Sequence, residues 1–545
     1  MKRILFIIIS LFSVAGLQAQ VTECMRIYTD KDNYLAGEEL WIKVCVTDSA
    51  YHEITASKVA YVEISDTRQV HAQGKIALQN GVGWGHVRFP QTMHSGTYQL
   101  TAYTRYMRNQ SADSFPKKYI AVLNADQATE EDNIEVLKDS VVMASAVPAS
   151  DKPIASTSGL STDKSVYGNR NKVTMKLPQL PGDIKELSVS VVRKDCVMPA
   201  FPASEYSQKG NPASGKHFIA ECEGHIVTGR LVEAGADSID ARLSCVGKDI
   251  RICDGQLQPD GTYAFYTSGI TDMQDIVLTA LPGGGHQGRL ELVSPFAEVL
   301  PGELPKLRVA YDEEALIERS IGAQLHHILP VDSTHNRSIQ EQLHDFHPWI
   351  SYNLDEYVRF NTVRETFIEF VLGLRVSKVE DKTIIRMLQE DIKRFSGLKA
   401  LVLIDGVPIE NHETVLDYNA RLLHHIHQYN GRYMFGNKLY EGIVSLITHR
   451  GSLPGLRLDE NSQLFAYEFP QNKPAFVIPV YDSEVQKKSR IPDFRHTLYW
   501  NPEITSATDT ISFYTSDMKG EYMVTLQGIT PTGEAIKIQS EFLVQ

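Results

Sequence analysis

The strongest constraint on the fold is a short opening motif that occurs twice in the chain. The motif reads Asp-Lys-x-x-Tyr at residues 30–34 and again at residues 163–167, and each copy precedes an alternating apolar run. Self-similarity of this kind indicates two copies of one structural unit. The second copy stops after its first half, because residues 195–216 are rich in Pro and Ser.

The missing half of the second copy is found at the C-terminal end. In the first copy, a strand, a Gly-x-Tyr hairpin and a final strand follow one another over residues 85–122, and residues 509–544 repeat this order. A half sandwich exposes an apolar face, so the two halves are expected to pair. The sequence predicts one β-sandwich at 20–125 and a second at 159–195 plus 493–545, split by an insertion of roughly 290 residues.

The first copy also shows a dense series of short strands. They are expected at 40–45, 59–64, 85–89, 98–103 and 118–122. Several such strands in about a hundred residues are typical of a β-sandwich. Together with the Asp-Lys-x-x-Tyr-x-x-Gly-Glu opening and the hairpin at 95–104, they resemble the macroglobulin-like (MG2-type) domain of α2-macroglobulins and bacterial envelope proteins.

The insertion begins with another group of short strands. These are expected at 226–231, 240–246, 262–266 and 276–280, with Asp260-Gly261 as a hairpin turn. They predict a third, inserted β-sandwich at 217–300. Residues 126–158 are polar and without periodicity, so we expect a linker there, and we expect a connector at 453–492.

A different pattern covers residues 311–452. The stretch 353–356 has the form of a capping box, and apolar residues then recur every three or four positions, which predicts an amphipathic helix. These residues are Tyr357, Phe360, Val363, Phe367 and Phe370. Two short runs on either side of residues 380–382 predict a β-hairpin.

Two apolar strands then bracket an irregular segment between Leu401 and Gly451. The first strand stops at Asp405-Gly406, a Tyr-to-Gly turn occupies 433–436, and the second strand ends at Thr448. In this order the elements resemble the plug domain of TonB-dependent outer-membrane receptors. The resemblance implies an α+β plug-like domain at 311–452. We single out its turn-forming positions, for which we expect a structural role: Asp405, Gly406, Tyr433 and Gly436.

A receptor barrel is not expected in this chain. Such a barrel needs several hundred residues, whereas 94 residues follow Gly451 and the second sandwich uses most of them. The fold class is therefore mainly β and multi-domain: macroglobulin-like or immunoglobulin-like sandwiches plus one α+β plug-like domain. This combination resembles a group of exported proteins of Bacteroidetes-type bacteria that join the two modules.

The N-terminal segment predicts export. Residues 1–19 have a basic start, a short apolar stretch and a small-residue cleavage site, as a signal peptide does. No later stretch approaches the roughly 18 apolar residues of a membrane span, so we expect no transmembrane span and at most peripheral membrane association. The net charge of −13 comes without a basic stripe, which argues against nucleic acid as a partner.

Strings that suggest catalytic or cofactor chemistry lack the context that such sites need. Residues 210–216 fit a phosphate loop, but His217 replaces the Mg²⁺-binding Ser or Thr, and 283–288 fit G-x-G-x-x-G but precede a strand. The six cysteines form no CxxC pair, so buried thiols are favoured over disulfides. The sequence contains no H-E-x-x-H motif, G-x-S-x-G elbow or macroglobulin thioester, and we expect no cofactor.

One histidine-rich strand remains a weaker candidate for metal binding. In a regular strand His425 and His427 share a face and could supply two nitrogens to Zn²⁺, although solvated strand histidines are favoured. We expect a non-catalytic scaffold or interaction protein of the periplasm or outer membrane, accessory to outer-membrane transport or assembly, whose partner is an envelope or outer-membrane protein. The alternatives are a non-covalent macroglobulin-like protease inhibitor and a metal-dependent envelope enzyme.

Overall fold

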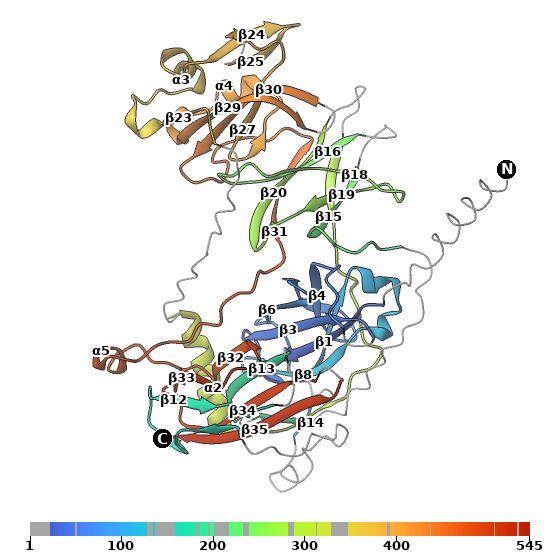
Figure 1. Ribbon diagram of the computed structural model, residues 1–545, viewed down its shortest axis with the longest axis vertical. Coiled ribbons are helices and arrows are strands. Elements are labelled where there is room, and N and C mark those ends of the chain that lie inside the picture. Colours follow the sequence, from blue (N-terminus) through green and yellow to red (C-terminus); the bar gives the residue numbers. More distant parts are fainter. Residues whose placement is uncertain are drawn as a thin grey trace, which may run out of the picture. The chain divides into compact units, whose positions relative to one another are not determined.

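The structure is a computed structural model of the chain (Figure 1). It describes residues 22–49, 52–127, 134–136, 159–180, 184, 186–194, 197–200, 217–232, 239–281, 288–311, 313–328, 347–389, 393–435, 438–505, 507–530 and 533–545. The predicted signal peptide, the phosphate-loop string at 210–216 and most of the string at 283–288 lie outside these residues. The protein is mainly β and divides into two compact units. The first comprises Met1–Cys222, Ala297–Ser333 and Gln471–Gln545, and the second comprises Glu223–Phe296 and Thr334–Pro470.

The first sandwich, in the first unit, consists of a three-stranded sheet, β1-β3-β6, and a five-stranded sheet, β2-β8-β7-β4-β5. Every strand expected from the sequence is present, and β1, β2 and β5 add to them. The strands are β1 Cys24–Thr29, β2 Asn33–Leu35, β3 Glu39–Thr47, β4 Val59–Ser65, β5 Val70–Ala77, β6 Val82–Arg88, β7 Gly96–Thr104 and β8 Lys117–Leu123, with 3₁₀ helices η1 Tyr106–Asn109 and η2 Ala112–Ser114.

The second sandwich joins strands from both ends of the chain. Its sheets have the orders β10-β12-β33 and β11-β35-β34-β13-β32. Val173 on β12 lies opposite Phe513 on β33, and β13 lies between β32 and β34 (Figure 1). The C-terminal strands thus pair with those near Val173, as expected. The strands are β10 Ser161–Thr162, β11 Val166–Tyr167, β12 Lys172–Lys176, β13 Leu187–Arg193, β32 Thr497–Ile504, β33 Thr510–Tyr514, β34 Gly520–Ile529 and β35 Ala535–Val544.

The repeated motif has the same hydrogen bond in both sandwiches. The Tyr34 hydroxyl donates to Asp30 Oδ1 at 2.8 Å, and the Tyr167 hydroxyl donates to Asp163 Oδ1 at 2.8 Å. Each aspartate also accepts a backbone N–H from the strand that follows. The strand that carries each tyrosine pairs in parallel with the last strand of its sandwich. The motif therefore anchors the first crossing between the two sheets.

The remaining elements of the first unit differ from three of the predicted ranges: the plug-like domain, the linker and the connector. Helix α2, Glu313–Ile328, falls in the predicted plug-like range but belongs to this unit, where buried Arg319 donates to the Glu38 carboxylate at 2.9 and 3.1 Å. The predicted linker contributes β9 to a small sheet, and the predicted connector contains a short helix. These elements are β9 Ile134–Val136, β14 Val197–Ala200, β22 Leu307–Tyr311 and α5 Glu484–Lys487.

The inserted sandwich, in the second unit, has two four-stranded sheets, β18-β19-β15-β21 and β17-β16-β20-β31. Strand β31 comes from residues expected to form a connector. It covers the edge of β20, and its Tyr467 packs into the core of this sandwich. The strands are β15 His225–Val232, β16 Asp240–Cys245, β17 Ile252–Asp254, β18 Gln256–Leu257, β19 Thr262–Thr267, β20 Met273–Leu281, β21 Arg289–Val293 and β31 Ser462–Glu468.

The rest of the second unit forms what we call the mixed-sheet domain, residues 347–458. Its main sheet has the order β23-β29-β30-β27-β28, with β27 parallel to β30, and the expected hairpin is present as β24–β25. The elements are β23 Ile350–Asn353, η4 Leu354–Glu356, α3 Val363–Glu369, β24 Leu374–Val379, β25 Lys382–Gln389, β26 Arg394–Phe395, β27 Leu401–Ile404, β28 Val407–Pro408, α4 His412–Leu416, η5 Ala420–Leu422, β29 Leu423–Phe435 and β30 Lys438–Thr448.

The helix expected from residue 353 begins ten residues later. Asn353 caps only the 3₁₀ turn η4, whereas Thr362 and Glu365 form the capping box that starts α3. The aromatic spacing that suggested one long helix arises instead from ring packing, because Tyr357 stacks on Phe370 with 4.4 Å between centroids. Aromatic contacts across a loop thus imitate helical periodicity.

Candidate functional site

Asp405 connects two strand ends through hydrogen bonds to its buried carboxylate. It follows β27 with a φ of 43°, and its carboxylate is fully buried. It accepts the Thr448 N–H and the Thr448 hydroxyl, each at 2.7 Å, and the Leu453 N–H at 2.8 Å. Buried carboxylates need such donors, and three of them hold the chain after β30 in a fixed turn. Asp405 therefore fixes the backbone position of residues 449–452.

Gly406 is required by a close backbone approach. Its φ of 79° is rarely adopted by other residues, and an added Cβ would lie 2.7 Å from the Cys245 carbonyl oxygen and 2.9 Å from that of Asp249. The Gly247 N–H donates to the Asp405 carbonyl at 2.9 Å. The turn is thus packed against a loop of the inserted sandwich within the same unit.

The other two turn positions do not join this cluster. Tyr433 lies far along β29, where its hydroxyl donates to the Asn430 carbonyl at 2.8 Å and burial raises its pKa. Gly436 lies outside the described residues. The structure therefore brings Asp405 and Gly406 together and places Tyr433 in a separate, local contact.

The predicted histidine pair gathers no third metal ligand in the part of the chain that the structure describes. The rings of His425 and His427 are 5.5 Å apart, and burial lowers the pKa of both imidazoles. The neighbouring His424, which strand alternation places on the other face, instead lies 3.4 Å from the Asp355 carboxylate. The described cysteines are free, and burial raises the pKa of the Cys45 and Cys245 thiols to about 12, so neither is a ready nucleophile.

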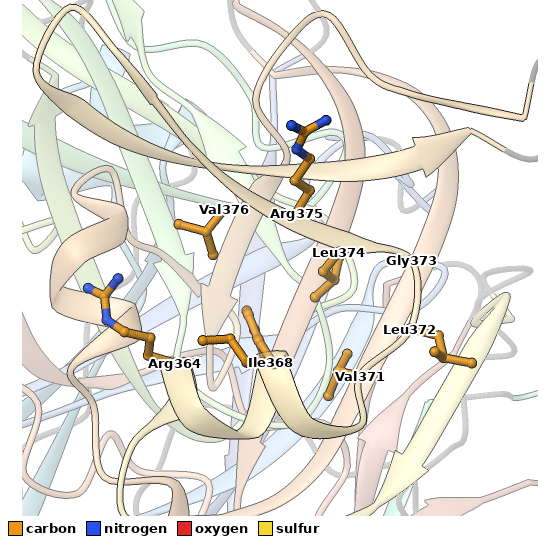
Figure 2. Close-up of a pocket in the computed structure, with 9 residues that line it drawn as sticks. Arg364, Ile368, Val371, Leu372, Gly373, Leu374, Arg375 and Val376 are labelled. Carbon is orange, nitrogen blue, oxygen red and sulfur yellow. The ribbon is translucent and has the colours of Figure 1, made fainter.

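An open hollow lies between α3 and β24 in the mixed-sheet domain (Figure 2). Its volume is about 480 Å³, and it is lined by Arg364, Phe367, Ile368, Val371, Leu372, Gly373, Leu374, Arg375 and Val376. Figure 2 shows Ile368, Val371 and Leu374 gathered about it. Val371 is buried, whereas the Ile368 and Leu372 side chains are each 72% exposed. The hollow therefore has an apolar floor and an apolar rim.

Exposed apolar side chains are frequent in the stretch of chain that contains this hollow, and two of them line it. Of the large hydrophobic residues that are exposed among the described ones, seven lie between residues 357 and 398: Tyr357, Val358, Ile368, Leu372, Val379, Phe395 and Leu398. Exposed apolar side chains that border a hollow commonly mark a contact site for another molecule. We call the pair that borders the hollow, Ile368 and Leu372, the apolar rim.

Positive charge lies on the other face of the β24–β25 hairpin. Arg375 on β24 lies directly opposite Arg386 on β25, and neither forms an ion pair with another described residue. Like charges at opposite strand positions destabilise a hairpin, and a carboxylate between them would relieve the repulsion. Arg364, on the helix side of the hollow, already pairs with Glu413. Figure 2 shows the Arg375 guanidinium pointing away from the apolar side chains at the hollow, as strand alternation with Leu374 and Val376 requires. The hollow thus suits an aliphatic group, and the other face of the hairpin suits a carboxylate.

Comparisons with known proteins give only distant likenesses. No protein-family model and no curated protein matches the chain. Among solved structures, native α2-macroglobulin of Escherichia coli aligns at a TM-score of 0.24 and 8% identity, over 97% of this chain and 40% of that one. Salmonella α2-macroglobulin reacted with methylamine gives 0.16 and 9%, over 96% and 23%. The Escherichia coli adhesin FdeC gives 0.16 and 10%, over 53% and 63%.

The chain thus spans less than half the length of the two macroglobulins. TM-scores this low do not establish a shared fold, so the β-sandwich architecture rests on the strand pairings described above. Within the described residues, no helix is both long enough and apolar enough to cross a bilayer.

Proposed function

We propose that this chain is a non-catalytic, exported interaction protein of the cell envelope, and that the face formed by α3 and the β24–β25 hairpin binds a partner protein. The observation that carries the proposal is the hollow with its exposed apolar rim. Leaving Ile368 and Leu372 in water forgoes about 1.5–3 kcal/mol for each side chain. Burial of both by a partner would recover that free energy.

The expected partner is a periplasmic or outer-membrane protein that presents an aliphatic side chain and a separate carboxylate. The aliphatic group would enter the hollow, and the carboxylate would reach Arg375 and Arg386 on the other face of the hairpin, whose charges have no described counter-ion. The resemblance of residues 401–451 to receptor plug domains supports an outer-membrane partner. This assignment makes the protein an accessory to transport or assembly.

Site-directed photo-crosslinking in intact cells tests the proposal. A photoreactive amino acid at Ile368 or Leu372 is expected to give one discrete adduct with an envelope protein, and Arg375→Glu should weaken it. The same probe at Leu257, an exposed apolar residue of the inserted sandwich, is the matched control and should give no such adduct. An adduct with a second copy of this chain, or equal labelling at Leu257, would contradict the proposal.

The protease-inhibitor alternative makes a different prediction. Purified protein incubated with a panel of proteases would then show stoichiometric, non-covalent inhibition. If the proposed function is correct, protease activity stays unchanged and the photo-adduct is still formed.

A further inference from the structure

We propose that Asp355, His424 and His449 form a binding site for a divalent transition-metal ion, with Zn²⁺ as the best match. The potential ligand atoms of these three residues lie within 4.8 Å of one another. His424 Nε2 is 3.4 Å from Asp355 Oδ2, and His449 Nε2 is 3.9 Å from Asp355 Oδ1. Two imidazole nitrogens and one carboxylate oxygen are a ligand set that Zn²⁺ and related ions accept.

A β-bulge directs His424 toward this cluster. In the β29–β30 pairing, Leu423 lies opposite Thr448 and His425 lies opposite Ile447, so His424 is an extra residue on its strand. A bulge breaks the alternation of side chains and re-aims the extra one. His424 and His425 consequently contact each other, with ring centroids 3.9 Å apart, although consecutive residues of a regular strand point to opposite faces.

His449 is held in place by its backbone. It is the first residue after β30, and its N–H donates to the Leu422 carbonyl at 3.1 Å. The turn that it opens is closed by Asp405, which accepts hydrogen bonds from Thr448 and Leu453 on either side. His424 and His449 then stack with 4.9 Å between their ring centroids. One histidine on β29 and one in the turn after β30 are thus placed side by side by main-chain contacts and by the Asp405 carboxylate.

Asp355 is oriented by its own neighbours. It lies in the 3₁₀ turn η4, where the Asn353 side chain accepts its N–H at 3.2 Å. The Arg359 guanidinium donates to Asp355 Oδ1 and to the Leu423 carbonyl, and Asp355 Oδ2 faces His424. A carboxylate held in this way through one oxygen presents the other oxygen to an ion, which is the usual arrangement around metal ligands.

Arg359 is also the group that competes with the ion. Its Nη2 lies 3.4 Å from His449 Nε2, and because a guanidinium can only donate, the two form a hydrogen bond only in the tautomer whose Nε2 carries the lone pair. A cation at the site would displace the guanidinium from His449 and would be repelled by its charge. The side chains of Asp355, His424 and His449 are 51%, 30% and 46% exposed, so an ion reaches them from solvent and keeps water in its open positions.

Titration calorimetry of the tag-free full chain, stripped with a chelator and titrated with ZnCl₂, tests the site. We expect one equivalent of Zn²⁺ to bind, and we expect His424→Ala and His449→Ala each to lower the affinity by about tenfold or more. His427→Ala is the matched control, because this histidine lies on the same strand outside the cluster, and its affinity should equal that of the wild type. Co²⁺ should give the visible absorption bands of a bound ion in the wild type and in His427→Ala, and these bands should be weakened or lost in His424→Ala and His449→Ala.

Arg359→Ala separates a metal site from a purely structural cluster. If the three residues bind Zn²⁺, removal of the competing guanidinium should raise the affinity. Absence of a binding isotherm in the wild type, or loss of binding in His427→Ala with retention in His424→Ala, would overturn the proposal. Because the substituted side chains are partly exposed, circular dichroism should show folded variants. Failure of the photo-crosslinking experiment would leave this test unaffected, since the two sites use different residues.

Discussion

Replacement of Asp405 by Ala should strongly destabilise the mixed-sheet domain. The substitution leaves three donors in the interior without an acceptor: the Thr448 N–H, the Thr448 hydroxyl and the Leu453 N–H. A buried donor left unsatisfied costs about 1–3 kcal/mol, so three cost roughly 3–9 kcal/mol before relaxation. Removal of the buried carboxylate offsets part of this cost, because the ion itself is expensive to bury. We expect a net loss of about 4 kcal/mol, against a typical domain stability of about 5–15 kcal/mol.

Local hydrogen exchange is the suitable assay, because a chain with several domains does not unfold in one step. In Asp405→Ala, backbone amides in peptides that span residues 444–456 should exchange faster. The decrease in the opening free energy calculated from their exchange rates should equal the decrease in the free energy of unfolding that urea reports for this domain. Thr448→Val removes a hydroxyl that donates to Asp405 and also accepts the Gly451 N–H at 2.9 Å. Its cost in the wild type should exceed its cost in the Asp405→Ala background by about 1 kcal/mol, the contribution of the bond to Asp405. Unchanged exchange at Thr448 and Leu453 in Asp405→Ala would refute the reasoning.

Three further outcomes are expected. Burial lowers the pKa of His412 to about 4 from its ordinary 6.5, so the unfolded chain binds the proton more tightly than the folded chain does. The free energy of unfolding should be highest above pH 6.5 and should fall between pH 6.5 and 4 by at most about 1.4 kcal/mol per pH unit. Urea titrations at several pH values should find this slope in the wild type and not in His412→Asn. Arg170→Lys should lower the free energy of unfolding by about 2–4 kcal/mol and therefore lower the thermal midpoint. One ammonium cannot replace a guanidinium that donates to both Asp517 oxygens, at 2.9 and 2.6 Å, and to four carbonyls. An unchanged midpoint in calorimetry would contradict this expectation. Gly406→Ala should cost about 2 kcal/mol more in urea than Gly261→Ala, since both have a positive φ but only Gly406 meets backbone oxygen atoms; equal costs would show that the clash is relieved.

The sandwich repeat could be predicted because its determinant is local in sequence. The hydroxyl of Tyr34 bonds to Asp30 four residues earlier, and Tyr167 bonds to Asp163 in the same way, so each five-residue motif contains a complete interaction. The pairing of the second copy with the C-terminal strands followed from a general requirement, that an apolar sheet face must be covered. Both the local hydrogen bond and the need to cover an apolar sheet face can therefore be predicted from the amino-acid sequence.

Other features depended on contacts that no local pattern records. Strand β31 reads as a weak alternation within a polar segment, and it becomes a strand because β20 offers an edge and the inserted sandwich accepts Tyr467. Helix α2 was not predicted from the sequence, and it packs in the first unit, where Arg319 pairs with Glu38, a residue 281 positions away. The partner of an amphipathic element is set by the tertiary fold.

The histidine cluster shows how one extra residue changes a functional prediction. Strict alternation pairs His425 with His427 and leaves His424 on the other face, where no sequence pattern suggests a companion. The bulge at His424 cancels that alternation, and the turn closed by Asp405 brings His449 beside it. Asp405 was singled out from the sequence for its turn-forming character, and the structure gives that turn a chemical consequence. The local signal identified the residue that holds the turn, and the ligands that the turn positions became visible only in three dimensions.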